Sequence, residues 1–459
     1  TRLDIEVSSA TPAGAYFVGN GRCVNCHGRA KIAGTMHRLG IWSPYEAGPL
    51  QDQTARTAEL WMALDSKFTS AGTTIYYYGY DSTRGMDKYK TAETDPGSGV
   101  SFTVTVRETG DTYEMLLHNV KTPSDPDRVL RVDAIYGGGV QKQRYLTKIT
   151  TTGGFYYATM PPQFQTEGSE ASAYGRTSKV WRDYNSSYWF DETTGLFKTP
   201  AASKSFEKNC ISCHANGTQV TGSDATGWTA SLVSDPIWGD FDSDGDGVRD
   251  EVNLGCETCH GPGSAHWEAA GQGRSIVSPS LLTPEREAMI CGQCHSRPKG
   301  ALSTDNPVNA AGWMMTAGTS RRDFLANFAT SQLDGAASDF YGDDKKHSKS
   351  HHQQYSDFIR GGMYKNAVQL LTCASCHDPH QRTNPRQLRA DPTNNAALCG
   401  GSCHPGPASS VKDHVDAKLG AGMGNLMKTA KCAQCHMPKT AKTGAGRPGL
   451  LAGTTQYWQ

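Results

Sequence analysis

The chain has 459 residues, and its 45 basic and 45 acidic side chains leave a formal net charge of zero. That balance excludes the basic surface typical of nucleic-acid-binding proteins, and no apolar run reaches the length of a membrane-spanning helix. Hydrophobic residues make up only 37% of the chain, which is modest for a protein of this length that has to fill several cores.

The first distinctive element along the chain is Cys23-Val-Asn-Cys26-His27, in an N-terminal segment predicted to span residues 1–40. All 14 cysteines form seven such close pairs, and a histidine follows each second cysteine. Disulfide frameworks and zinc sites do not require that histidine. It is typical of c-type haem attachment, in which two thiols bond the porphyrin and the histidine binds the iron. We therefore predict seven covalent haem c groups, bound by Cys23, Cys26, His27, Cys210, Cys213, His214, Cys256, Cys259, His260, Cys291, Cys294, His295, Cys373, Cys376, His377, Cys399, Cys403, His404, Cys432, Cys435 and His436.

Residues 41–205 contain no such motif and are predicted to form a β-rich, haem-free domain. Segments rich in aromatic and β-branched residues are separated there by turn residues such as Gly110-Asp111. The predicted strands span residues 73–80, 101–106, 112–120, 129–136, 144–149 and 155–160. We expect a small antiparallel sheet or sandwich.

Six of the seven motifs crowd into residues 206–440. Only short helices are predicted there, at residues 283–290, 356–366 and 413–419. The flat apolar faces of seven haems would compensate for the modest hydrophobic content. The predicted fold class is therefore a multihaem cytochrome, mostly irregular coil with short helices packed around a haem chain, plus a small antiparallel β-rich domain.

The sixth motif, Cys399-Gly-Gly-Ser-Cys403-His404, has three residues between its cysteines where the others have two. The additional residue must bulge, and glycine tolerates the backbone conformations of a bulge best. A haem site is favoured here over the alternative of a plain disulfide.

An acidic loop, Asp242-Ser-Asp244-Gly-Asp246-Gly247-Val-Arg-Asp250, separates the second and third motifs. Carboxylates at alternate positions with glycine at the sixth are typical of calcium loops. Asn253 stands where an EF-hand has its bidentate glutamate, so a full EF-hand is excluded. The predicted Ca²⁺ ligands are Asp242, Asp244, Asp246 and Asp250, and the alternative is a solvated acidic turn.

Eight of the 15 histidines lie outside the motifs, which is one more than seven irons need as second ligands. This near match favours bis-histidine coordination, although the ordinary role of such a histidine is at the surface or in a hydrogen bond. The predicted distal ligands are His37, His118, His266, His347, His351, His352, His380 and His414, with a single ligand expected from the pair His351 and His352.

The runs at residues 256–266, 355–380 and 432–438 are similar to the large multihaem cytochrome c family with octahaem and tetratricopeptide-linked members. Arg144-Tyr-Leu146 and residues 181–200 resemble its segment before the second haem. The resemblance implies a haem-wire architecture and a respiratory role outside the cytoplasm. The chain departs from the family in its seven motifs, its one wider spacing and its lack of repeat helices, so no enzyme activity is carried over.

The leading functional hypothesis is electron transfer through the seven haems in an exported protein, periplasmic or extracellular, whose leader has been removed. Its partners would be redox proteins or extracellular acceptors, and other copies of itself in a filament docked through a tail at residues 441–459. One alternative is a periplasmic oxidoreductase acting on a small nitrogen or sulfur compound, which requires an iron with an open position. Another is a module in which the β-rich region binds minerals or polysaccharide.

Overall fold

The computed structural model describes residues 11–51, 67–81, 86–92, 99–137, 142–165, 180–272, 275–302, 306–328, 340–341, 347–348, 352–381, 383–401 and 403–437. The predicted tail at residues 441–459 and His351 lie outside the described residues, and so does the side chain of His347. In this part of the chain, no helix has the length and apolar character needed to cross a membrane.

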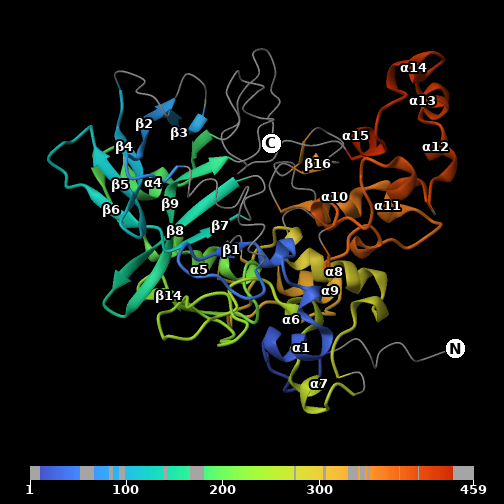
Figure 1. The fold of residues 1–459 in the computed structure, drawn as a ribbon, viewed down its shortest axis with the longest axis horizontal. Helices are drawn as coiled ribbons and strands as arrows, with labels where there is room; N and C mark the ends of the chain where they lie inside the picture. Colours follow the sequence, from blue (N-terminus) through green and yellow to red (C-terminus); the bar gives the residue numbers. More distant parts are fainter. Residues whose placement is uncertain are drawn as a thin grey trace.

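Two five-stranded antiparallel sheets occupy the region between the first two motifs (Figure 1). One contains, in spatial order, β3 (Met86–Ala92), β2 (Thr73–Asp81), β4 (Phe102–Thr109), β5 (Thr112–Asn119) and β6 (Arg128–Arg131). The other contains β1 (Ile41–Trp42), β7 (Ala134–Tyr136), β8 (Lys142–Thr151), β9 (Gly154–Gln165) and β10 (Val180–Asp183). Five of the six strands predicted from the sequence are confirmed, and so is the turn at Gly110, whose φ of 60° suits glycine. The strand predicted at residues 129–136 is instead two strands, β6 and β7, which belong to different sheets, and β1, β3 and β10 were not predicted.

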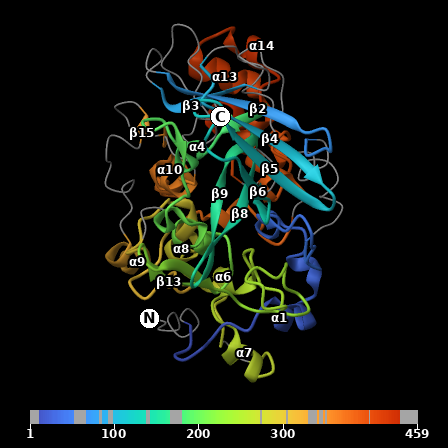
Figure 2. The ribbon, with the colours of Figure 1, turned by 90° about the vertical axis from the view of Figure 1, so that its left-hand side faces the viewer.

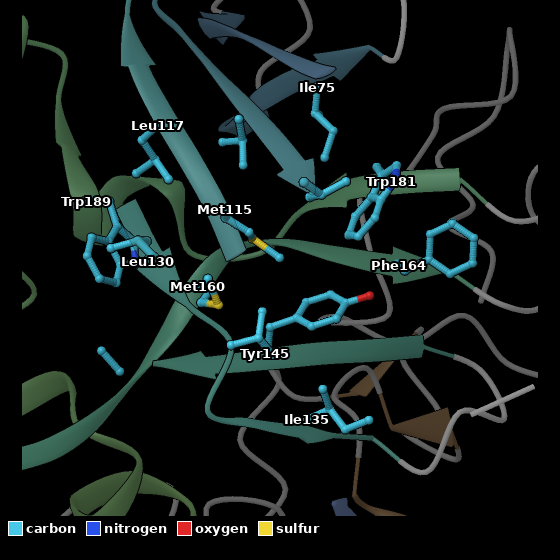
Figure 3. Close-up of a cluster of buried hydrophobic side chains, with 14 of the residues drawn as sticks. Ile75, Met115, Leu117, Leu130, Ile135, Tyr145, Met160, Phe164, Trp181 and Trp189 are labelled. Atoms are coloured by element: carbon cyan, nitrogen blue, oxygen red, sulfur yellow. The ribbon is translucent and has the colours of Figure 1, made fainter. Parts of the chain in front are cut away.

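The two sheets bury their facing sides against each other in one apolar core. Alternate residues of the strands point inward, as the two-residue period of a β-strand requires. Figure 3 shows Met115 and Leu117 of one sheet near Met160 and Tyr145 of the other. All four side chains are buried, so the β-rich region is held together by its own hydrophobic core.

The predicted fold class is wrong in describing the chain as mostly irregular with one small β-rich domain. Besides the two large sheets, the structure has three two-stranded antiparallel sheets. They pair β11 (Phe190–Asp191) with β12 (Leu196–Phe197), β13 (Gln219–Ser223) with β14 (Gly227–Ser231), and β15 (Phe340–Tyr341) with β16 (His347–Ser348). Antiparallel sheet therefore extends into the motif-rich part. The Thr- and Gly-rich sequence of β13 and β14 has the composition of a loop, which hides this hairpin from a periodicity argument.

Most of the short helices belong to the motif-rich part and lie on the opposite side of the molecule from the large sheets, whereas α4 (Ser186–Trp189) and α5 (Phe206–Asn209) pack against β9 (Figures 1 and 2). These short helices are α1 (Asn20–His27), α4 (Ser186–Trp189), α5 (Phe206–Asn209), α6 (Cys256–His260), α7 (Ser264–Glu268), α8 (Pro284–His295), α9 (Arg321–Asn327), α10 (Gln354–Arg360), α11 (Gly362–Lys365), α12 (Pro405–Ser409), α13 (Val411–Leu419), α14 (Met423–Met427) and α15 (Cys432–His436). Four of them, α1, α6, α8 and α15, end at a motif histidine.

A second apolar core crosses the domain boundary predicted at residue 205. It joins Tyr136 and Leu146 of the large sheet to Phe206, Ile211 and Trp228 of the motif-rich part. Glu207 of α5 lies at the same junction, where its Oε1 accepts a hydrogen bond of 2.8 Å from the backbone N–H of Tyr157. The two parts are therefore packed together through side chains as well as through the chain itself.

We predict that Glu207 makes the stability of this junction depend on pH. Burial raises the pKa of Glu207 to about 8 from its usual 4.5. Protonated Glu207 contributes fully to the free energy of unfolding below the usual pKa. This contribution, on the order of 4 kcal/mol, is lost as the pH rises toward and through the raised pKa. The Tm of the native protein should therefore fall between about pH 4.5 and pH 8 and level off above that.

The variant Glu207→Gln should lose most of this fall, because its amide keeps the acceptor for Tyr157 and does not ionise. Glu192→Gln is the matched control, since Glu192 is a partly exposed carboxylate that pairs with Lys121. Thermal unfolding followed by circular dichroism measures both variants. Equal pH dependence in Glu207→Gln and the unmodified protein would contradict the assignment.

Candidate haem-binding sites

Four motif histidines face a second histidine from a distant part of the chain. The ring centroids of His27 and His266 are 6.4 Å apart, and those of His260 and His380 are 6.2 Å apart. The distances are 5.9 Å for His436 and His414, and 6.5 Å for His214 and His352. In each pair one member belongs to a haem motif and the other does not.

These separations fit a haem iron between the two rings. A metal–imidazole bond of about 2 Å on each side, with about 1.1 Å from the nitrogen to the ring centre, places the centroids about 6.2 Å apart. Direct stacking of two rings would bring them closer than that. The residues present therefore suit bis-histidine coordination at motifs 23–27, 210–214, 256–260 and 432–436.

The outer nitrogens of several motif histidines are already engaged. The Nδ1 of His260 lies 2.9 Å from the carbonyl oxygen of Val277, and the Nδ1 of His377 lies 2.9 Å from that of Arg386. Because a carbonyl oxygen only accepts, each Nδ1 must carry the proton and donate it. The Nε2 lone pair is thereby left for a metal, which is the usual arrangement behind a histidine ligand.

His37, which lies outside the motifs, is partly buried near two motif histidines, His295 and His377. Burial lowers the pKa of His37 to about 4, and the charges of His295 and His377 lower it further. It is therefore neutral at pH 7, as a metal ligand must be. The next residue, Arg38, forms a fully buried ion pair of 2.5 Å with Asp240 and donates to the carbonyl of Asn253, which fixes the position of the loop that carries His37.

The motif at 210–214 is enclosed by the β-rich region. The ring centroids of Tyr136 and Phe206 lie 6.0 Å and 5.9 Å from that of His214. Burial, followed by the charge of Arg144, lowers the pKa of His214 to about 4. This imidazole is therefore also neutral and able to bind a metal.

The motifs form one connected series in space. Thiols of neighbouring motifs lie close enough to interact through hydrogen bonding or charge. The interacting pairs are Cys23 with Cys256, Cys259 with Cys294, Cys213 with Cys294, Cys291 with Cys373, Cys376 with Cys403, and Cys399 with Cys432. These interactions place each motif near another one.

Buried carboxylates hold the first motif against the third. Glu257, inside the third motif, accepts backbone N–H bonds from Val18 at 2.9 Å and Gly263 at 2.7 Å. Glu251 accepts from the N–H of Asn20, and Asp235 accepts from that of Gly21 at 2.9 Å. These N–H groups at the start of α1 have no partners within the helix. Carboxylates from more than 200 residues away satisfy them, which no local sequence pattern could predict.

The wider motif at 399–404 is accommodated by a π-helical turn, η11 (Ala396–Gly400). A π-turn holds one more residue than an α-helical turn, and the N–H of His404 bonds the carbonyl of Cys399 at 3.1 Å. A Cβ on Gly400 would lie 2.3 Å from the Cβ of Ala408. The predicted bulge is therefore present, and its glycine is required by close packing.

The remaining predicted ligands are placed less completely. His118 lies half-exposed on β5, where its Nδ1 is 2.8 Å from Asp127, so its position gives a ligand role no support. Among the described residues, no facing imidazole is seen for His404. The backbone of His347 lies in β16, whereas its side chain and His351 are outside the described residues. His351 and His352 were predicted to supply a single ligand between them, and His352 lies beside the motif histidine His214.

Three of the four predicted calcium ligands come together. Oxygens of Asp242, Asp244 and Asp250 lie within 4.8 Å of one another. Asp246 is not part of this group, since its Oδ1 accepts from the N–H of Val248 at 2.7 Å. Asp250 is buried and also accepts from the N–H of Ser243 at 3.1 Å.

Comparison with known proteins supports the haem assignment. The family described as the doubled CXXCH motif matches residues 366–409, a segment that holds both motif 373–377 and the wider motif 399–404. No curated protein and no solved structure matches the chain. The match shows a c-type haem-binding motif in a protein involved in electron transfer, and it includes the motif whose spacing left a disulfide as an alternative.

We predict that removing a facing histidine opens one coordination position. In His414→Ala the iron bound by His436 should lose its second imidazole and become high-spin, while the other haems stay low-spin. Electron paramagnetic resonance of the oxidised protein measures this as one high-spin haem per chain.

His118→Ala is the control, because His118 pairs with Asp127 on the β-rich region. It should leave the spectrum unchanged. A fully low-spin His414→Ala protein with an unchanged haem content would argue against the pairing of His414 with His436.

Proposed function

We propose that this protein binds seven haem c groups and carries electrons along them outside the cytoplasm. The observation that supports this most strongly is that each motif has a thiol close enough to interact with a thiol of another motif, so that the seven motifs form one connected series. Haem c bound at such motifs supplies one-electron redox chemistry. The protein itself attaches each group, orients its ligands through hydrogen bonds and excludes water from the interior sites.

The ends of the series lie far apart. Motif 23–27 is in α1 and motif 432–436 is in α15, and these helices lie at opposite ends of the motif-rich part in Figure 1. Figure 2 agrees, since α1 lies low and α13 and α14, which carry and adjoin His414, lie at the top. A series that spans the molecule suits transfer from a donor on one side to an acceptor on the other.

The histidine count supports electron transfer over substrate chemistry. If His118 is set aside for its ion pair with Asp127, seven histidines outside the motifs remain for seven irons. Five of these are placed beside motif histidines. We propose His347 and His351 for the two other sites, which revises the expectation of a single ligand from the pair His351 and His352. Full bis-histidine coordination leaves no open position for a small nitrogen or sulfur compound.

This proposal predicts seven haems and seven electrons per chain. Mass spectrometry of the intact polypeptide should give an added mass of seven haem groups. Anaerobic reductive titration should then take up seven electrons, and a ferric acceptor too large to enter the protein should remove all of them. A mass well short of seven groups, or a fraction that stays reduced, would sink the proposal.

We further propose that the protein works outside the cell and that copies join end to end into a filament, with redox proteins and extracellular acceptors as other partners. Terminal motifs at opposite ends are what such a polymer requires, because successive copies would bring motif 23–27 near motif 432–436. Negative-stain microscopy of extracellular material should show long filaments. Uniformly monomeric particles at native concentration would rule the polymer out and leave electron transfer within one chain intact.

We also propose that the loop of Asp242, Asp244 and Asp250 binds Ca²⁺. It is joined to the haem-bearing part, since the N–H of Asp240 bonds the carbonyl of Asp250 at 2.7 Å and Asp240 pairs with Arg38. Calorimetric titration should show one Ca²⁺ per chain, lost in Asp244→Asn. The control Asp246→Asn should bind less than tenfold more weakly. Absence of binding in the unmodified protein, or equal effects of both variants, would contradict the site.

A further inference from the structure

The series of motifs branches. Cys294 interacts with Cys259 and with Cys213, and Cys291 of the same motif interacts with Cys373. Motif 291–295 therefore adjoins three others, at 256–260, 210–214 and 373–377. The path from α1 to α15 passes through the first and the last of these. Motif 210–214 lies off that path, on a third arm.

A buried cation lies beside this third arm. The guanidinium carbon of Arg144 lies 4.0 Å from the ring centroid of Tyr184 and 5.5 Å from that of Tyr136, and the Tyr136 ring contacts His214 edge-on. Arg144 is only 7% exposed, and its Nε donates to Oε1 of Gln163 at 3.2 Å. These contacts hold the guanidinium group inside the protein, on the side of Tyr136 that adjoins motif 210–214.

A buried positive charge favours the reduced state of a nearby iron. Reduction of a bis-histidine haem lowers its charge by one, so a cation close to it stabilises the reduced form more than the oxidised form. The effect is strong where the surroundings have a low dielectric constant. The rings of Tyr136 and Phe206, each only 2% exposed, lie against His214 and provide such surroundings.

We propose that Arg144 raises the reduction potential of the haem held at motif 210–214, and that this side position stores an electron while the main path conducts. Arg144 would act on this haem through its charge, and it touches no reacting atom. The inference rests on the proposed function, because it requires a haem at this motif. It adds an unequal role for one site within the series.

The test compares Arg144→Gln with Arg144→Lys in redox titrations of the holoprotein. Arg144→Gln removes the charge, so one haem of the seven should titrate at a lower potential while the potentials of the other six stay unchanged. Arg144→Lys retains the charge and should restore most of the original curve. Arg107→Gln is the control, because Arg107 pairs with Glu114 on the other large sheet and should shift nothing.

His352→Met identifies the haem concerned, because it changes the axial ligand opposite His214 and therefore the spectrum of that haem alone. The component marked in this way should be the one that Arg144→Gln shifts. Because a Met ligand would itself raise the potential, the order of oxidation is measured in the protein with His352 intact, where this component should be the last to lose its electron to a ferric acceptor. Unchanged potentials in Arg144→Gln with seven haems bound, or equal shifts in Arg144→Gln and Arg144→Lys, would overturn the inference. A chain with fewer than seven haems would instead defeat the proposed function.

Discussion

With the proposed haem coordination, the motif-rich part of this protein depends on imidazole pairs that meet across long stretches of chain. His27 faces His266, and His260 faces His380. An iron held by both members of such a pair closes a loop of more than a hundred residues, and the entropy that loop closure costs rises only slowly with length. Coordination can therefore hold together helices too short to be stable alone. This explains how α1 and α6, of eight and five residues, can carry haem motifs.

Coordination does not act by itself, because the protein positions its ligands before they meet a metal. The carboxylates of Glu257, Glu251 and Asp235 cap the start of α1 and bring motif 23–27 against motif 256–260. The buried pair of Arg38 and Asp240 does the same for the loop of His37. Breaking such a pair leaves an uncompensated buried charge, so each network holds its ligand in one place. Side-chain hydrogen bonding and iron coordination thus reinforce the same arrangement.

The sequence was informative where chemistry is local and uninformative where it is not. The cysteine–histidine spacing and the alternating strands from Thr73 onward predicted the motifs and both faces of the β-rich core. The sequence could not predict which histidine faces each motif histidine. His266 follows the third motif by six residues, yet it faces His27 of the first motif. Its position is set by packing of α7 on the N-terminal segment. The hairpin of β13 and β14 was missed because its Thr- and Gly-rich strands resemble a loop.

The order of motifs in space explains why the β-rich region is part of the electron-transfer protein. Along the chain the second motif follows the first, but in space the third motif occupies the place beside the first. The second motif is drawn to the sheets by the core of Tyr136, Leu146 and Phe206. The sheet that supplies Tyr136 also supplies Arg144 from β8. The region inserted between the first two motifs therefore both displaces motif 210–214 from the main path and sets the electrostatic surroundings of that site.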